Sequence, residues 1–378
     1  MTKGNTTVKV LHIASGDLWA GAEVQLFTLA KALNNQQDIK INVVLLNHGM
    51  LEQKLLNNGI NVIVLDESRL NGFQILLQLI STIRIIKPDV IHTHRVKENI
   101  FGSIAALLNG NIPTLRTSHG APEHKPAWCN ILKRVILFLD WFSGRLLQKK
   151  IIAVSDDLAE ILQKDFPADK IKVIENGIDL ATLTTTVKSV KLDIEQNVPS
   201  FRIGIAGRLV PVKRVDLFIK AAAELLNTRP ELKTSFHIFG DGPLRTELTA
   251  LSKKLNIEKM IHFEGHSENM QKELENLDIL LITSDHEGLP MVLLEAMTHE
   301  KVVIAHAVGG IPKVLDQGEC GVLVSKHEPA AYADAIYQLI KMPEDYKKYS
   351  KKAFEQVNRY YSSEQNARHY HGVYKNLI

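Results

Sequence analysis

Two cations follow a short apolar segment in the second half of the chain. The segment Phe201–Gly207 is predicted to be a strand, Arg208 follows directly after it, and Lys213 stands before a predicted helix at Arg214–Asn227. A planar guanidinium and a mobile ammonium suit a diphosphate, whose charge must be neutralised both when it is bound and when it leaves. A solvated pair of cations at a helix start is the alternative interpretation.

Two carboxylates frame the start of another predicted helix, Met291–Met297. Glu287 precedes this helix, and Glu295 lies inside it among apolar residues. A proline just before the helix is tolerated there, and the free backbone N–H groups of a helix start bind anions. A carboxylate on an apolar helix face is unfavourable unless something pairs with it. Ribose hydroxyls are a natural partner for Glu295, and a structural salt bridge is the alternative.

Histidines end two predicted strands in the first half of the chain. His92 and His94 stand at the end of one strand, and His119 follows another and precedes a glycine. The His92/His94 pair lacks a third ligand at a suitable spacing, so we expect no metal there. His119 is the better functional candidate because its position is expected to face a cleft between two domains.

Two glycine-rich turns follow predicted strands. The loop from Gly16 to Gly21 is a weak signal of phosphate binding, and it does not match the G-x-G-x-x-G pattern of dinucleotide-binding folds. The turn Gly240–Pro243, taken alone, is more typical of a plain tight turn. Neither turn defines a cofactor site by itself.

The elements that must position these residues form two series. Short β-branched segments alternate with helix-like segments, which predicts parallel sheets with helices on both faces. The predicted strands of the first series are Val8–Ala14, Ile41–Leu46, Asn61–Leu65, Val90–Thr93, Pro113–Thr117 and Ile151–Val154. Those of the second series are Phe201–Gly207, Thr234–Phe239, Met260–Glu264, Ile279–Thr283, Val302–Ala305 and Gly321–Val324. We therefore expect two doubly wound α/β domains that bind ligands at the carboxyl ends of their strands.

The boundary between the domains follows from the loss of periodicity. After Asp179 the chain is rich in Thr, Lys, Val and Ser up to Ser200, which is typical of a linker. We expect a first domain at residues 1–180, a linker at 181–200 and a second domain at 201–360.

Composition is that of an ordinary folded protein. The chain has 378 residues, of which 45% are hydrophobic and 23% charged, enough for two cores and unlike disordered chains. Its two cysteines, Cys129 and Cys320, form neither a metal-ligand motif nor a disulfide framework. We find no signal peptide and no apolar stretch of the roughly 20 residues that a spanning helix needs. A net charge of +3 gives no indication of nucleic-acid binding, and we expect a cytoplasmic protein.

Taken together, these motifs resemble the retaining glycosyltransferases of family 4, which have the two-domain GT-B fold. The resemblance covers nearly the whole chain, and its matching residues are Gly21-Ala22-Glu23, Asp89-Val90-Ile91-His92-Thr93-His94, Ser118-His119-Gly120, Glu175-Asn176-Gly177-Ile178-Asp179, Gly207-Arg208 with Lys213, Gly240-Asp241-Gly242-Pro243, and Glu287 with Glu295. The family usually has a glutamate soon after Gly309-Gly310-Ile311-Pro312. This sequence has Lys313-Val314-Leu315-Asp316 there, a departure that affects one expected contact with the donor sugar.

That resemblance implies roles for individual residues. Arg208 and Lys213 would bind the donor diphosphate, and Glu295 would bind the ribose hydroxyls. His119 and Glu287 would sit beside the transferred sugar. Further donor contacts would come from Gly21 and from the backbone of Gly288, Leu289, Pro290 and Met291. The family also implies a C-terminal helix, at about residues 361–378, that crosses back onto the first domain.

The resemblance also implies a reaction. The donor would be a sugar nucleotide, with a UDP-sugar as the first expectation and a GDP-sugar as the next. The acceptor would be a glycan or a lipid-linked molecule in bacterial surface-polysaccharide synthesis. Cations and a helix terminus would stabilise the leaving diphosphate, so we expect neither a divalent metal nor a separate cofactor.

Two alternatives to a transferase are compatible with the sequence. A sugar-nucleotide 2-epimerase would share the two-domain fold but act on the donor alone, without an acceptor. A non-catalytic nucleotide-sugar binding module would bind the donor without turning it over.

A basic and aromatic segment at residues 128–147 suggests a contact outside the active site. Between Lys125 and Lys150 the chain carries six cations against a single acid, Asp140. Peripheral contact with the anionic inner face of the cytoplasmic membrane is one interpretation. A core helix of the first domain with basic ends is the other.

Overall fold

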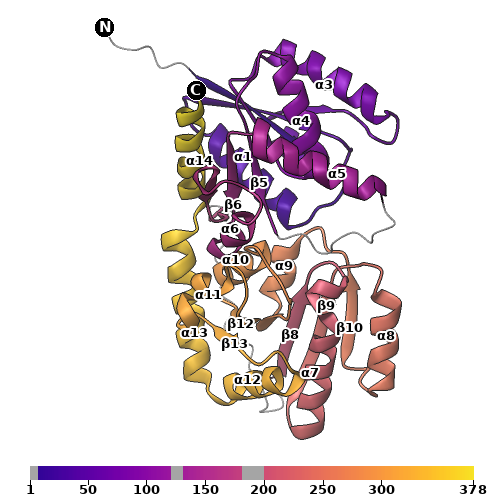
Figure 1. The fold of residues 1–378 in the computed structure, drawn as a ribbon. Helices are drawn as coiled ribbons and strands as arrows, with labels where there is room; N and C mark the ends of the chain where they lie inside the picture. Colours follow the sequence, from indigo (N-terminus) through magenta and orange to yellow (C-terminus); the bar gives the residue numbers. More distant parts are fainter. Residues whose placement is uncertain (1–6, 121–130, 181–199) are drawn as a thin grey trace. The chain divides into compact units, whose positions relative to one another are not determined.

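The computed structural model describes residues 7–120, 131–180 and 200–378. The chain divides into two compact units (Figure 1). The first comprises Met1–Asp179 together with Ser362–Ile378, and the second comprises Leu180–Tyr361. The linker expected at 181–200 lies outside the described residues except for its last position.

The first unit is built on a seven-stranded parallel sheet with the strand order β3-β2-β1-β4-β5-β6-β7. Its strands are β1 Val8–Ala14, β2 Ile39–Leu45, β3 Asn61–Val64, β4 Val90–Thr93, β5 Thr114–Ser118, β6 Lys150–Ala153 and β7 Ile171–Val173. The short edge strand β7 was not expected, because three residues of mixed exposure carry too little periodicity to be recognised.

Helices cover both faces of this sheet, as the alternation of side chains along β1 requires. Val8 and Val10 pack with α1, α2 and α14, whereas Leu11 and Ile13 pack with α3 and α4 on the opposite face. The helices of the unit are α1 Gly21–Asn34, α2 Met50–Asn57, α3 Gly72–Ile86, α4 Val96–Leu108, α5 Ile131–Phe142, α6 Asp156–Leu162 and α14 Ser363–Leu377, with a π-helical turn at Ser143–Leu147 and a 3₁₀ turn at Ala168–Lys170.

Helix α14 belongs to the first unit although it ends the chain. The Ser362 hydroxyl caps it by accepting a hydrogen bond from the Gln365 backbone N–H at 3.2 Å. Figure 1 shows α14, in yellow, beside α1, and its buried tyrosines Tyr370 and Tyr374 enter the core on the α1 face of the sheet.

The second unit is built on a six-stranded parallel sheet with the order β10-β9-β8-β11-β12-β13. Its strands are β8 Ser200–Ala206, β9 Lys233–Phe239, β10 Ile261–Gly265, β11 Ile279–Ile282, β12 Val302–His306 and β13 Val322–Val324. In each sheet the strand order reverses between the first strand of the unit and its fourth, that is, between β1 and β4 and between β8 and β11. The expectation of two doubly wound α/β domains is therefore confirmed.

Helices of the second unit follow each strand in turn. They are α7 Val215–Thr228, α8 Arg245–Lys254, α9 Met270–Glu275, α10 Met291–Thr298, α11 Ile311–Val314, α12 Pro329–Lys341 and α13 Pro343–Tyr360, with 3₁₀ turns at Pro211–Lys213 and Asp316–Gly318. Helix α7 starts one residue later than expected because Arg214 adopts a left-handed conformation with φ of 49°. Among the described residues, no helix combines the length and the apolarity needed to cross a membrane.

Candidate active site

The residues of the second unit that are predicted to bind the donor nucleotide lie near the point where the strand order of its sheet reverses. β8 and β11 are hydrogen-bonded neighbours, and their carboxyl ends lead into the segments that carry Arg208, Lys213 and Glu287. A small cavity opens between these strands and is lined by Ile205, Ala206, Gly207, Lys213, Val215, Leu281, Ile282, Ser284, Glu287 and Val292. Ligands of doubly wound sheets bind at this topological position.

Lys213 and Glu287 meet at this cavity, although they are far apart in the sequence. Lys213 Nζ lies 2.6 Å from Glu287 Oε1, and the Ser284 hydroxyl donates to the same oxygen at 2.6 Å. The Glu287 side chain is 9% exposed and that of Lys213 is 27% exposed. The carboxylate therefore holds the ammonium at the cavity, where it can meet an anionic ligand.

Arg208 extends from the loop after β8 and is exposed. The turn at Gly240 supports this loop: a Cβ atom at Gly240 would lie 2.0 Å from the carbonyl oxygen of Gly207, and Gly240 has φ of +130°. The Leu209 backbone N–H donates to the Asp241 carbonyl at 2.9 Å. The glycine turn thus allows two loops to pack closely, which a plain tight turn would not require.

The segment from Gly288 to Met291 forms the start of α10, as expected. Gly288 and Leu289 are buried, and Pro290 stands at the N-cap position without a side-chain cap. The Gly288 carbonyl accepts a hydrogen bond from the Gly310 backbone N–H at 2.7 Å. A Cβ atom at Gly309 would lie 2.0 Å from the Glu287 carbonyl oxygen, so the glycine pair allows this close approach.

Glu295 is a buried carboxyl without a visible partner. It is 7% exposed, and burial raises the pKa of its carboxyl to about 7. Among the described residues, its carboxyl makes no hydrogen bond or ion pair, so the alternative of a structural salt bridge is not observed. Because Glu295 follows the cavity-lining Val292 by three positions on α10, both side chains share one helix face.

Other polar residues at this site were not recognised from the sequence. Asp285 accepts hydrogen bonds from Arg214 Nη1 at 3.2 Å and from His327 Nε2 at 3.1 Å. The His327 ring stacks on His306, with ring centroids 3.9 Å apart. These contacts tie the loop after β11 to the start of α7 and to the loop after β13. The residues in these contacts are too far apart in the sequence for a local spacing pattern to indicate them.

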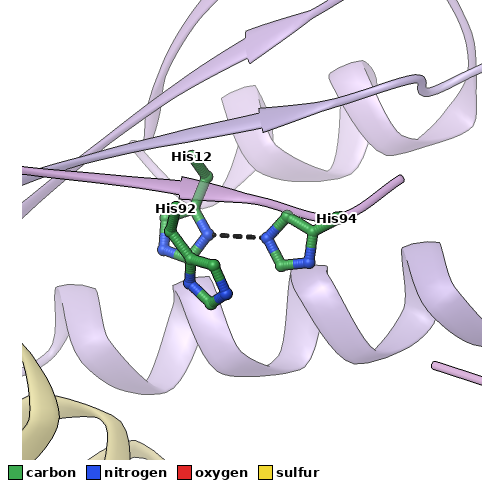
Figure 2. A group of neighbouring side chains, drawn as sticks. All are labelled: His12, His92 and His94. Atoms are coloured by element: carbon green, nitrogen blue, oxygen red, sulfur yellow. Dashed lines mark hydrogen bonds between the residues drawn. The ribbon is translucent and has the colours of Figure 1, made fainter. Parts of the chain in front are cut away.

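Four histidines of the first unit, His12, His92, His94 and His119, form one cluster on the α14 face of the sheet. β1 and β4 are paired with His12 opposite His92, and His94 follows β4 (Figure 2). His94 lies between His12 and His119: its Nε2 is 3.0 Å from His12 Nδ1, and its Nδ1 is 3.3 Å from His119 Nε2. His12 was missed by sequence reasoning, although its parity along β1 places it on this face.

Burial keeps this cluster neutral at physiological pH. It lowers the pKa of His12 to about 3 and that of His119 to about 4, and it places the pKa of His92 and of His94 well below the usual value. Desolvation penalises the charged imidazolium in each case. Arg95 adds to the effect at His119, since a nearby positive charge further disfavours protonation.

The cluster corrects the expectation that the His92/His94 pair lacks a third ligand at a suitable spacing. One ligand atom from each of His12, His92 and His94 lies within 4.8 Å of the others (Figure 2). The same nitrogens take part in hydrogen bonds with each other, with Thr117 and with Tyr374. A metal ion would have to displace these bonds.

Gly21 stands at the start of α1, near a second polar group of the first unit. Glu23, in the first turn of α1, is 3% exposed and forms an ion pair with Arg95. Arg95 also lies 3.4 Å from Asp17. Burial raises the pKa of Glu23, which Arg95 partly offsets. Arg95, which follows β4, therefore connects to the loop before α1 through Asp17 and to the first turn of α1 through Glu23.

Helix α5 corrects one interpretation of the basic, aromatic segment. Residues 128–130 lie outside the described residues, but α5 contains no buried residue, so it is not a core helix. Arg116 holds it to the sheet through Asp140, with Nη1 to Oδ1 at 2.9 Å. Its exposed apolar side chains are Ile131, Leu132, Val135, Phe138, Leu139 and Phe142.

Two glycosyltransferase family models match this chain. Residues 19–182 match the family model described as Glycosyltransferase Family 4, and residues 188–356 match the model described as Glycosyl transferases group 1. A similar protein is UDP-Gal:alpha-D-GlcNAc-diphosphoundecaprenol alpha-1,3-galactosyltransferase of Escherichia coli, at 25% identity over 90% of this chain and 89% of that enzyme.

Other relatives are matched over part of their length. D-inositol 3-phosphate glycosyltransferase of Corynebacterium efficiens is 30% identical over 68% of this chain and 63% of that enzyme. N-acetyl-alpha-D-glucosaminyl L-malate synthase of Bacillus anthracis is 32% identical over 44% of this chain and 43% of that enzyme.

Solved structures show the same fold. The Anabaena protein HepE in complex with UDP-glucose has a TM-score of 0.83 at 21% identity, over 97% of this chain and 99% of that chain. The sucrose-phosphate synthase of Thermosynechococcus elongatus has a TM-score of 0.78 at 18% identity, over 98% and 99% of the two chains. Two consecutive family matches and this fold lead to one conclusion: the chain belongs to the family 4 glycosyltransferases, with the GT-B fold.

Proposed function

We propose that this glycosyltransferase moves a sugar from a UDP-sugar to a glycan or lipid-linked acceptor, with retention of configuration and without a divalent metal. The E. coli relative is named for UDP-galactose and a diphosphoundecaprenol-linked acceptor, and HepE was solved with UDP-glucose. Both names favour a uridine nucleotide. The E. coli enzyme's acceptor also favours a role in bacterial surface-polysaccharide synthesis.

The observation that carries the proposal is that the second unit brings together two cations and a buried carboxyl without a partner among the described residues. Lys213 presents an ammonium held by Glu287, and Arg208 extends from the neighbouring loop. Glu295 is a buried carboxyl that has no partner among the described residues. A nucleoside diphosphate offers phosphates to the cations and ribose hydroxyls to the carboxyl.

This arrangement suits the charge that develops in the reaction. Breaking the bond between the sugar and the phosphate creates negative charge on the diphosphate and positive character on the sugar. Lys213 and Arg208 stabilise the leaving diphosphate. Glu287 carries negative charge beside Lys213, where the positive character of the sugar would develop. These cations take the role that a divalent metal has in other transferases.

The acceptor side of the proposal includes peripheral contact with an anionic membrane through α5. Its side chains of Leu132 and Phe138 are 72% and 58% exposed, and Lys133 and Arg134 lie beside them. Apolar and basic residues together favour an anionic lipid surface. Vesicles containing phosphatidylglycerol should sediment the protein in a salt-dependent way. Leu132→Ser with Phe138→Ser should lose this binding, whereas Ile85→Ser, at a 79% exposed site on α3, should keep it.

The donor experiment measures thermal stabilisation by UDP, GDP and ADP and by their sugar conjugates, each with magnesium or with EDTA. Preferential binding to the folded state raises its apparent stability. We expect UDP and UDP-sugars to stabilise the protein equally well in both conditions. The responsive sugar nucleotide is then incubated with and without lipid-linked acceptors. Turnover of the donor without an acceptor to a different sugar would favour an epimerase, and binding without any turnover would favour a binding module.

A further inference from the structure

The buried histidines of the first unit belong to one unbranched hydrogen-bond chain of seven groups. Starting in α14, Tyr370 Oη lies 2.9 Å from Thr117 Oγ1, and Thr117 Oγ1 lies 2.8 Å from His92 Nε2. His92 Nδ1 lies 2.8 Å from Tyr374 Oη, which is 3.5 Å from His12 Nε2. His12 Nδ1, both nitrogens of His94, and His119 Nε2 complete the chain.

Every inner member of this chain has two partners in the described structure, one on each side. A neutral imidazole has one N–H donor and one acceptor nitrogen, and a hydroxyl donates one hydrogen. A ring that donates to one neighbour must accept from the other. A hydroxyl such as Tyr374 could accept from both neighbours only by leaving its own buried hydrogen without an acceptor, which carries a desolvation penalty. With every inner hydrogen paired, the chain has two orientations, with all its hydrogens pointing towards His119 or all pointing towards Tyr370.

The end of the chain at Tyr370 selects between these orientations. Tyr370 is 1% exposed, and within the described residues its hydroxyl contacts Thr117 alone. If Thr117 donated to Tyr370, the phenolic O–H would be buried without an acceptor, which carries a desolvation penalty. Tyr370 therefore donates to Thr117, and each following bond points the same way.

The orientation reaches His119 at the other end. His94 donates from Nδ1, so His119 accepts at Nε2 and must carry its own hydrogen on Nδ1. His119 Nδ1 has no hydrogen-bond partner in the part of the chain that the structure describes, which leaves it available as a donor. The low pKa values of these rings support their neutral state at physiological pH.

We propose that α14 sets the tautomer of His119 through this chain, so that His119 presents an N–H donor at Nδ1 to an oxygen of a sugar substrate. Tyr374, His12 and His94 are then positioning residues that act through His119. The statement about the sugar rests on the proposed function, whereas the tautomer is a property of the protein alone. Both can be tested separately.

The test uses nuclear magnetic resonance of the full-length protein labelled with ¹⁵N-histidine, in which one-bond and two-bond couplings distinguish the protonated nitrogen from the bare one. His119 is assigned by comparison with His119→Asn. We expect the Nδ1–H tautomer of His119 to dominate by roughly tenfold or more. A dominant Nε2–H tautomer in the unmodified protein would overturn the proposal, whether or not any variant folds.

Two matched variants identify which tyrosine transmits the orientation. Tyr370→Phe leaves Thr117 as the new end of the chain, and its hydroxyl has the same reason to donate, so the tautomer should be unchanged. Tyr374→Phe interrupts the chain, so the Nε2–H form of His119 should become populated. Each variant removes one buried hydroxyl from the same helix, so an equal response of His119 in both would contradict the transmission.

Turnover and metal binding complete the test. With the assigned donor and acceptor, kcat should fall further in Tyr374→Phe than in Tyr370→Phe. Absence of transfer together with the expected tautomers would reject the proposed function and leave the chain intact. A one-to-one shift of the His12, His92 and His94 nitrogens on addition of Zn²⁺ at neutral pH would overturn the chain, because a metal-bound nitrogen can neither donate nor accept.

Discussion

The two sheets share a topology but differ in the residues at their switch points, the positions where the strand order reverses. In the first unit, the neighbouring strands β1 and β4 carry His12 and His92, which are buried, neutral and hydrogen-bonded. In the second unit, the neighbouring strands β8 and β11 lead to Lys213 and Glu287, which are charged and line a cavity. The fold supplies a position in both cases, and side chains decide what that position does.

This difference shows how burial determines whether a titratable side chain is charged. A fully buried imidazole loses its charge because desolvation lowers its pKa. Lys213 and Glu287 form an ion pair at the cavity, and part of the Lys213 side chain meets solvent. The first switch point is therefore suited to orienting a neutral hydrogen-bond donor, and the second switch point is suited to binding an anion.

The sharpest way to break the comparison is to remove the cation of the second unit. Lys213→Ala should lower kcat about 100- to 1,000-fold, because it would remove a cation from the proposed diphosphate site and leave Glu287 without its ion-pair partner. Steady-state kinetics with saturating donor measure this. Lys254→Ala, at an exposed position of α8, is the control and should leave kcat within twofold of the unmodified enzyme. Equal kinetics in both variants would remove Lys213 from the site.

A second change tests the support of the Arg208 loop. Gly240→Ala should lower the free energy of unfolding by about 2–3 kcal/mol, because its Cβ atom would collide with the Gly207 carbonyl and its φ is positive. The control is Gly265→Ala, which shares a positive φ but meets only the Arg245 side chain at 3.8 Å, and about 1 kcal/mol is expected. Urea unfolding measures both. Equal losses of unfolding free energy in the two variants would mean that the loops at Gly207 and Gly240 can move apart at little energetic cost.

The pH dependence of unfolding tests the neutral state of the first switch point. His12 has a pKa of about 3 when folded and about 6.5 when unfolded, so the unfolded chain binds more protons between these values. Stability is therefore lost as pH falls below about 6.5. At pH 5, His12 alone should account for about 2 kcal/mol.

Tryptophan fluorescence can follow this effect in the first unit. All three tryptophans, Trp19, Trp128 and Trp141, lie within residues 1–179. We expect their urea midpoint to decrease from pH 7.5 to pH 5, and to decrease less in a His12→Asn variant. A midpoint that does not change over this range would mean that the histidines bind protons as readily in the folded protein as in the unfolded chain.

The smallest effect concerns Glu295 in the second unit. Glu295→Gln should weaken UDP binding about tenfold, because a neutral amide accepts weaker hydrogen bonds from ribose hydroxyls than a carboxylate does. With a pKa of about 7, the unmodified carboxyl must lose a proton to bind as an acceptor, so UDP affinity should rise between pH 6 and pH 8. Calorimetry should show a flatter dependence in the variant. An identical pH dependence in both proteins would place the titrating group elsewhere.

Strand positions and the start of α10 were largely predictable from the sequence. β1 and β4 match their predicted bounds, and other predicted strands shift by one or two residues, because apolar β-branched segments report burial directly. The segment from Glu287 to Met291 could be placed before α10 because proline and the adjoining apolar run mark a helix start locally. Such signals lie within a few residues of each other.

Contacts between distant segments could not be predicted in this way. His12 meets His94 across 82 residues, and Tyr374 meets His12 across 362. The expectation that the His92/His94 pair lacks a third ligand was wrong, because no local spacing indicates a third histidine from another strand. Similarly, the apolar period of α5 indicated a helix, but not that all its residues would avoid the core.

The sequence by itself determined the elements, their order and the types of charge that each loop carries, since these depend on local periodicity and composition. Tertiary structure alone decided which groups become neutral, which pair and which are left without a partner. Lys213 finds Glu287, the histidines join Tyr370 and Tyr374 of α14, and Glu295 is buried unpaired. The physical reason is that desolvation and hydrogen bonding depend on neighbours that only folding brings together.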